Sequence, residues 1–222
     1  MLTFAKNLEL VRIAPQNDWV VFIIMGCIFL YIFMLISLQR DSSVKDFLMQ
    51  QFPDSSNTFL SWLTVSLVFA LLSAAFVSPY IPIVPKKVSD LQLFGYELNK
   101  FGFAFFSITG FYILKTMLSY LYFAGTGAIK QWSIFYFTAS KYYFCISILM
   151  IILCTANFFY EIDQLNILPY YGAIFFLMLI FKLSFYWFHK NNILPEKWYY
   201  KFLYICTLQI LPFLVLWKVL FF

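Results

Sequence analysis

The chain has 222 residues and a formal net charge of +5, with 63% hydrophobic and only 11% charged residues and a mean hydropathy of +0.83. Soluble domains are closer to half apolar and a quarter charged, so this composition excludes an ordinary water-soluble globular domain. Lys and Arg are scattered without a cluster of four, which argues against a nucleic-acid partner and for loops that signal membrane topology.

Six continuous apolar runs dominate the sequence, and none of them contains Asp or Glu. A run of about 20 residues matches one helical crossing of a bilayer, and a bilayer admits only helices or closed barrels. We therefore predict an all-α fold: one domain over residues 1–222, a polytopic transmembrane helical bundle surrounded by the lipid bilayer. The predicted spans, about six, are residues 19–38, 59–78, 101–123, 142–160, 170–188 and 202–222.

Short amphipathic segments are predicted between the first spans. Asn17 or Asp18 is suited to cap the first helix. Residues 43–52 combine a capping-box pattern, Ser43 with Asp46, and apolar residues at helical spacing, which is typical of a helix lying at the membrane interface. The same pattern predicts a second interfacial helix over residues 86–100, after a proline-rich exit from the second span.

The second half of the chain has two irregular features. Residues 130–141 include a stretch too short to span the membrane, which either lies flat or extends the fourth span as a long tilted helix. Pro212 lies inside the last run and should kink it unless a neighbour satisfies the freed carbonyl. The four cysteines lie inside apolar runs without C-x-x-C spacing, so we predict no disulfide, no metal site and no cofactor.

Membrane orientation follows from the positive charges in the loops. The loops on one side carry seven Lys and Arg residues and those on the other side, with the N-terminus, carry five. Because positive charge favours the cytoplasmic side, both termini are predicted on the periplasmic side.

Lys115 is the most unusual residue, because it lies well inside the third run. Tyr112, Ser119 and Tyr122 share its side of the helix at spacings of three and four, so these four residues form a candidate polar intramembrane site. It could contact an anion or a partner helix. Alternatively, the lysine stem snorkels towards the interface and the stripe satisfies its ammonium group.

Other polar residues have simpler interpretations. Lys182 and Lys218 are closer to the ends of their runs, and snorkelling explains both. Asn157 and Gln209 are amides inside runs and are candidates for polar contacts between helices. His189 is the only histidine, and Glu161 with Asp163 forms a short acidic loop; solvation and anchoring explain these three residues better than catalysis does.

Glycine is scarce beside 30 Phe and 16 Tyr, and no run contains G-x-x-x-G. Helix packing is therefore expected to rest on bulky aromatic side chains rather than on close contacts of small residues. Aromatic helix surfaces can face lipid or bind other membrane proteins, and the sequence leaves both open.

The last run, residues 202–220, and the sequence NDW at residues 17–19 resemble a family of integral membrane proteins from Bacteroidetes that is known as a domain of unknown function. The resemblance covers the whole chain and implies a location in the inner membrane of a Gram-negative envelope. It also implies an acidic residue at the position of Gln209, where this chain departs from the pattern. The resemblance implies no activity and no catalytic residues.

Two functions remain open at this stage. The first is a non-catalytic membrane subunit or accessory protein of a bacterial envelope complex, such as one for protein export or envelope assembly, which would bind other membrane proteins through aromatic helix surfaces. The second is a small uncoupled transporter or channel with an anion path lined by Lys115. No catalytic set is recognisable, so we do not expect an enzyme.

Overall fold

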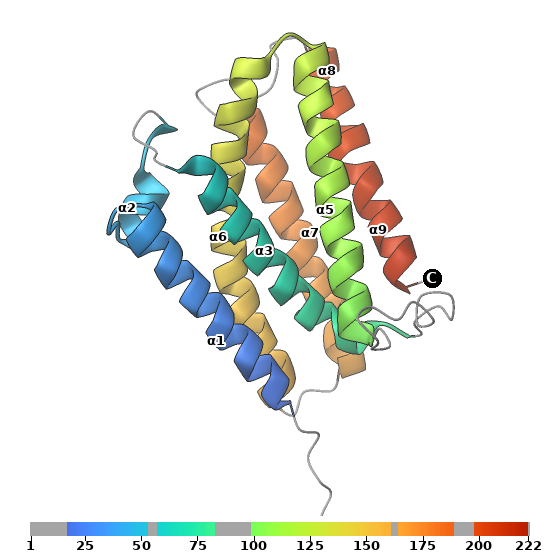
Figure 1. Cartoon of the computed structure of the whole chain (residues 1–222). Coiled ribbons are helices and arrows are strands. Elements are labelled where there is room, and N and C mark those ends of the chain that lie inside the picture. Colours follow the sequence, from blue (N-terminus) through green and yellow to red (C-terminus); the bar gives the residue numbers. More distant parts are fainter. Residues whose placement is uncertain (1–16, 53–56, 83–98, 161–163, 189–197, 222) are drawn as a thin grey trace, which may run out of the picture.

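The computed structural model describes residues 17–52, 57–82, 99–160, 164–188 and 198–221. All regular secondary structure in these ranges is helical, which confirms the predicted all-α bundle (Figure 1). The elements are α1 (Asp18–Phe33), η1 (Met34–Leu38), α2 (Val44–Met49), α3 (Thr58–Val77), η3 (Ser78–Tyr80), α5 (Lys100–Gly125), α6 (Ile129–Phe159), α7 (Gln164–Phe188), α8 (Trp198–Leu203), η4 (Tyr204–Ile210) and α9 (Leu211–Phe221).

Five helical segments of the described chain are long and apolar enough to cross a membrane: Asp18–Leu38, Thr58–Tyr80, Lys100–Gly125, Gln131–Phe159 and Trp198–Phe221. The fifth predicted span, residues 170–188, corresponds to α7, which has 25 residues, but its described apolar part, Pro169–Ser184, is shorter than a full crossing. These lengths and compositions fit a multi-pass membrane protein.

Helix α3 is the centre of the bundle. Half of its most apolar window is buried, which is the largest share among the candidate spans, and it packs against α1, α5 and α6. Its buried positions Ser66, Ala70 and Ala74 recur every four residues, and Ala70 and Ala74 pack with Ala104 of α5. The prediction that packing rests on bulky aromatic side chains rather than on small residues does not hold at this contact, where alanine, rather than glycine, lets α3 and α5 meet.

Polar side chains hold both ends of the first span, which consists of α1 and η1. Asn17 stands at the N-cap position of α1, but its side chain makes no cap hydrogen bond, so the predicted cap by Asn17 is wrong. Its amide instead donates to the carbonyl of Phe158 at 3.1 Å, which ties α1 to the end of α6. Directly after η1, the buried amide of Gln39 donates to the Ser61 hydroxyl of α3 at 2.6 Å.

A short helix, α2, is present where the first amphipathic helix was predicted. Its capping box is complete, because the Ser43 hydroxyl accepts from the Asp46 amide while the Asp46 carboxylate accepts from the Ser43 amide. The Nζ of Lys141 on α6 donates to the carbonyls of Leu48 and Gln50, where α2 ends. The second predicted interfacial helix, residues 86–100, falls largely outside the described residues.

Two predictions for the second half of the chain have clear outcomes. Residues 130–141 belong to the long helix α6, so they extend the fourth span rather than lie flat. The last span widens into the π-helix η4 directly before Pro212, and α9 continues from Leu211. The missing N–H of proline is thus accommodated by a local change of helix type.

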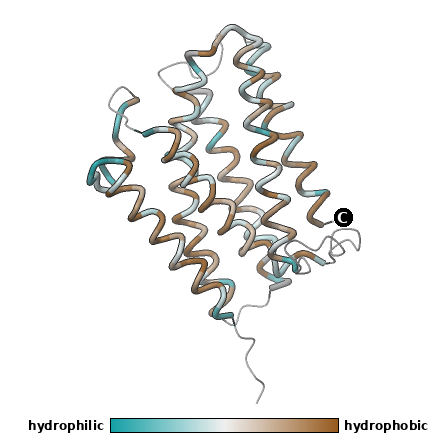
Figure 2. The backbone as a smooth tube through the Cα atoms, in the orientation of Figure 1, coloured by the Kyte–Doolittle hydropathy of each residue, from teal (hydrophilic) through white to brown (hydrophobic). Residues whose placement is uncertain are grey.

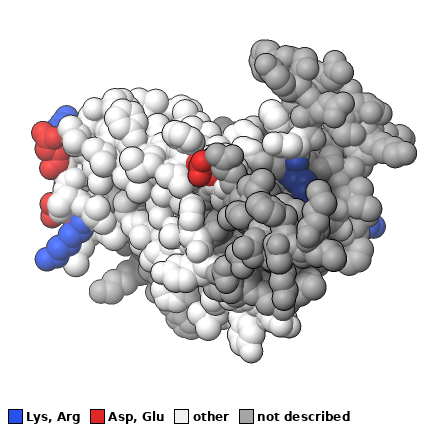
Figure 3. Space-filling view, turned by 90° about the horizontal axis from the view of Figure 1, so that it is seen from below, with Lys and Arg blue, Asp and Glu red and all other residues white. Residues whose placement is uncertain are grey.

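The described surface is largely apolar. Hydrophilic residues gather at α2 and at helix ends, while the long helices are hydrophobic along most of their length (Figure 2). Seen from below, charged side chains are few and lie mainly at the rim (Figure 3). Side chains such as Phe22 and Phe29 of α1 and Phe176 and Leu177 of α7 are more than 60% exposed, as expected for contact with lipid.

A two-lysine chamber between α3, α5, α6 and α7

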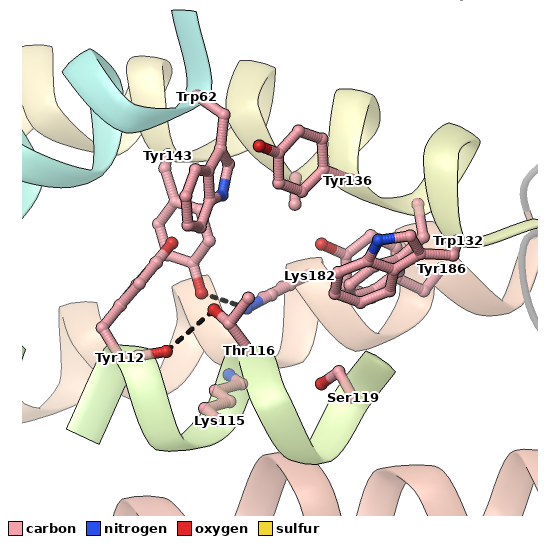
Figure 4. A pocket seen from close by; sticks show the side chains of 12 residues that line it. Trp62, Tyr112, Lys115, Thr116, Ser119, Trp132, Tyr136, Tyr143, Lys182 and Tyr186 are labelled. Carbon is pink, nitrogen blue, oxygen red and sulfur yellow. Dashed lines mark hydrogen bonds between the residues drawn. The ribbon is translucent and has the colours of Figure 1, made fainter. Parts of the chain in front are cut away.

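A small cavity of about 30 Å³ lies between α3, α5, α6 and α7, and we call it the chamber (Figure 4). Helix α5 contributes Tyr112, Lys115, Thr116 and Ser119 at spacings of three and four, because those positions share one side of a helix. A volume of about 10–15 Å³ holds one water molecule, so the chamber has room for about two waters or one monatomic ion.

Lys115 is anchored by the last span. Its Nζ donates to Oε1 of Gln209 at 2.7 Å, and Nε2 of Gln209 donates to the hydroxyl of the fully buried Tyr204, also at 2.7 Å. The buried Ser119 hydroxyl lies beside the Tyr204 hydroxyl. A polar chain therefore runs from α5 into η4 and holds the Lys115 ammonium at the chamber instead of at the membrane interface.

Lys182 of α7 is a second cation in the same chamber, and its placement overturns a prediction. Its side chain is only 7% exposed, so the expected snorkelling is wrong. Its Nζ donates to the Tyr143 hydroxyl at 2.7 Å and lies 4.5, 5.5 and 5.8 Å from the ring centroids of Tyr143, Tyr142 and Tyr186. The electron-rich faces of these rings attract the ammonium group and retain it inside the bundle.

The two ammonium groups face one cavity and are close enough to repel each other. No Asp or Glu is among the described residues that line the chamber. Two cations in a low-dielectric site without a carboxylate favour a bound anion, because an anion offsets both the desolvation of the charges and their mutual repulsion.

The four residues of the predicted stripe have different surroundings. Tyr112, Lys115 and Ser119 line the chamber. Tyr122 does not: its hydroxyl donates to the carbonyl of Tyr200 at 2.8 Å, which links α5 to α8. Tyr122 thus serves the packing of the last span.

The two candidate interhelical amides both bond to other helices. Asn157 of α6 accepts a hydrogen bond from the Tyr80 hydroxyl at 2.6 Å, far from the chamber, while Gln209 belongs to the Lys115 chain described above. His189, Glu161 and Asp163 lie outside the described residues. The four cysteines are free thiols.

In a comparison with protein families, the chain matches the family described as Domain of unknown function (DUF4271) over residues 15–220. The chain belongs to this family. The match includes both segments that carry the resemblance, NDW at residues 17–19 and the last span. Neither the comparison with curated proteins nor the comparison with solved structures gives a match.

Several residues that line the chamber were not predicted from the sequence. Lys182 was placed too near a helix end, and Tyr143, Trp62 and Tyr136 were not distinguished from the many other aromatic residues. One signal was available for Lys182: it is the second lysine inside an apolar run, and a pair of such cations in separate spans is costly unless they share a site.

Proposed function

We propose that this chain is a non-catalytic protein of the bacterial inner membrane that binds a small anion in the chamber and lets it pass without coupling to protons. The observation that carries the proposal is the sharing of one cavity by Lys115 and Lys182 with no carboxylate among its lining residues. Chloride is the probe of choice, because the chamber volume of about 30 Å³ suits a monatomic anion.

The lack of proton coupling is part of the proposal. Carriers that move protons across membranes usually use Asp, Glu or His within their spans. In the described spans the only such residue is Asp18, which is the first residue of α1. An anion would therefore move down its own gradient.

The test uses the purified full chain in lipid vesicles loaded with chloride. We expect chloride efflux from vesicles with the unaltered protein and efflux at the background rate with Lys115→Met or Lys182→Met. Lys218→Met is the matched control, because Lys218 is exposed on α9 and should leave the efflux unchanged. Efflux that persists in both chamber variants would overturn the proposal, as would efflux at the background rate from vesicles with the unaltered protein.

A second candidate is an accessory subunit of an envelope complex, such as one for protein export or envelope assembly. The exposed aromatic side chains of α7, Tyr170, Phe176 and Phe181, favour it, since each is more than 60% exposed. A photo-crosslinker placed at position 176 should then capture one defined membrane protein, whereas a crosslinker at the buried Ile108 should not. Crosslinks to lipid alone would count against this candidate.

We further propose that both termini are periplasmic. The bias of loop Lys and Arg residues supports this orientation, and α1 begins at the same end of the bundle at which α9 ends (Figure 1). A reporter enzyme that is active only outside the cytoplasm should be active when fused after Phe222. An inactive fusion at Phe222 with an active fusion after Gly127 would reverse the orientation.

A further inference from the structure

A second and larger cavity of about 390 Å³ adjoins the chamber, and we call it the vestibule. Much of its lining is aromatic, with Phe52, Phe59, Trp62, Trp132 and Tyr136, and hydroxyl groups complete it. Its volume lies within the range of about 300–1,000 Å³ that is typical of pockets for small organic ligands. A monatomic anion needs no cavity of this size.

The chamber and the vestibule share a wall. Trp62, Thr116, Trp132 and Tyr136 line both cavities. The rings of Trp62 and Tyr136 stack with centroids 4.8 Å apart, and Trp132 lies 5.9 Å from Tyr136 on another side. The Tyr136 hydroxyl is buried and has no hydrogen-bond partner in the part of the chain that the structure describes.

The chamber and the vestibule form one continuous site with two different environments. On the chamber side lie two ammonium groups, and on the vestibule side lie aromatic side chains and hydroxyls. An unpaired buried hydroxyl is costly, and a ligand oxygen at the shared wall would satisfy it. Positive charge at one end and flat apolar surfaces at the other are complementary to a molecule with a negative head and a flat apolar body.

We infer that the chamber and the vestibule together bind an aromatic carboxylate, with its carboxylate facing Lys115 and Lys182 and its ring lying among the aromatic side chains of the vestibule. The inference rests on the proposed function, because the carboxylate occupies the place of the small anion. Fatty acids carry the same carboxylate but lack a flat ring, so they are the alternative ligand for this site.

The experiment is a competition on the purified full chain in detergent, with chloride binding followed by the broadening of the chloride NMR line. Benzoate, cyclohexanecarboxylate and octanoate are added as competitors. Benzoate and cyclohexanecarboxylate have the same number of carbon atoms, but only benzoate is flat. We expect benzoate to displace chloride at a concentration about tenfold lower than cyclohexanecarboxylate does, since aromatic stacking favours the flat ring.

Phe59→Ala sharpens the competition, because Phe59 lines the vestibule but not the chamber and is 63% exposed, which makes misfolding a small risk. We expect it to weaken competition by benzoate about threefold to tenfold and to leave chloride broadening unchanged. The matched control is Phe22→Ala on α1, which is 77% exposed and lines neither cavity, and it should change neither quantity.

The outcomes separate the two proposals. Chloride broadening that benzoate does not reduce overturns the aromatic-carboxylate inference and leaves the proposed function standing. Absence of chloride broadening overturns the proposed function itself. Displacement by octanoate at lower concentration than benzoate would assign the vestibule to aliphatic acids and also overturn the inference.

Discussion

The two halves of α5 show how the same helix can build either a dry contact or a polar chamber. In the N-terminal half, Ala104 is fully buried against Ala70 and Ala74 of α3, and the small side chains let the two helices approach closely. In the C-terminal half, Lys115 and Ser119 meet the tyrosines and tryptophans of α3 and α6 across a cavity. The size of the side chains on the facing helices decides whether a void remains between them.

The two halves of α5 differ in what they contribute, one to stability and the other to function. The dry contact is where α3 and α5 are held together, and the chamber is where the bundle tolerates charged groups that weaken packing. If this division is correct, substitutions in the two halves should affect different measurements.

Overpacking the dry half should have the largest effect on stability. Ala74→Leu adds a bulky side chain at a fully buried position, and we expect a loss of about 1–3 kcal/mol or more in the free energy of unfolding. Thermal unfolding in detergent measures the change. Ala173→Leu on the exposed side of α7 is the matched control and should be neutral. If Ala74→Leu and Ala173→Leu were equally stable, the contact between small residues would not be what holds α3 against α5.

A carboxylate placed beside Lys115 should change anion binding without lowering stability. In Gln209→Glu the new carboxylate would replace the amide oxygen that lies 2.7 Å from Lys115 Nζ and pair with that cation. We expect chloride broadening to disappear because the site then holds its own negative charge, while the unfolding temperature stays equal or rises. Gln209→Leu is the comparison, since it should lower stability by about 0.6–1.7 kcal/mol through loss of the interhelical bonds. Undiminished chloride binding in Gln209→Glu would show that Lys115 does not hold the anion.

Loss of the bond between α6 and α2 should have a local effect. Lys141→Met removes the ammonium group that donates to the carbonyls of Leu48 and Gln50, and we expect faster hydrogen exchange in residues 44–50 with little change in global stability. Lys45→Met, on the exposed side of α2, is the control. Unchanged exchange in Lys141→Met would mean that the packing of Phe47 against Phe144 is sufficient to hold α2.

The smallest predicted effect concerns pH and the capping box. Hydrogen bonds from the hydroxyl and the backbone amide of Ser43 lower the pKa of Asp46 below its ordinary value of 3.8. A carboxyl whose pKa is lowered by folding stabilises α2 above pH 3.8, and this contribution is lost as the pH falls through the lowered pKa. Exchange of the first α2 amides should therefore accelerate below pH 3.8 in the unaltered chain. In Asp46→Asn, exchange of these amides should change with pH only as much as the intrinsic exchange rate does. Equal pH profiles of exchange in Asp46→Asn and in the unaltered chain would refute the role of the carboxylate.

The sequence by itself determined the helical membrane fold, because continuous apolar runs leave no other way to satisfy the backbone in a bilayer. It also determined the α2 capping box and the unusual position of Lys115, since these depend on residues close together in the chain. The partner of Lys115 was not predictable: Gln209 is 94 positions away, and only the packing of the last span against α5 brings the two side chains together. The same holds for Lys182, because distance from a helix end does not reveal whether a lysine faces lipid or a ring of tyrosines. Local spacing fixes which residues share a helix face, whereas the contacts between faces decide which charges meet.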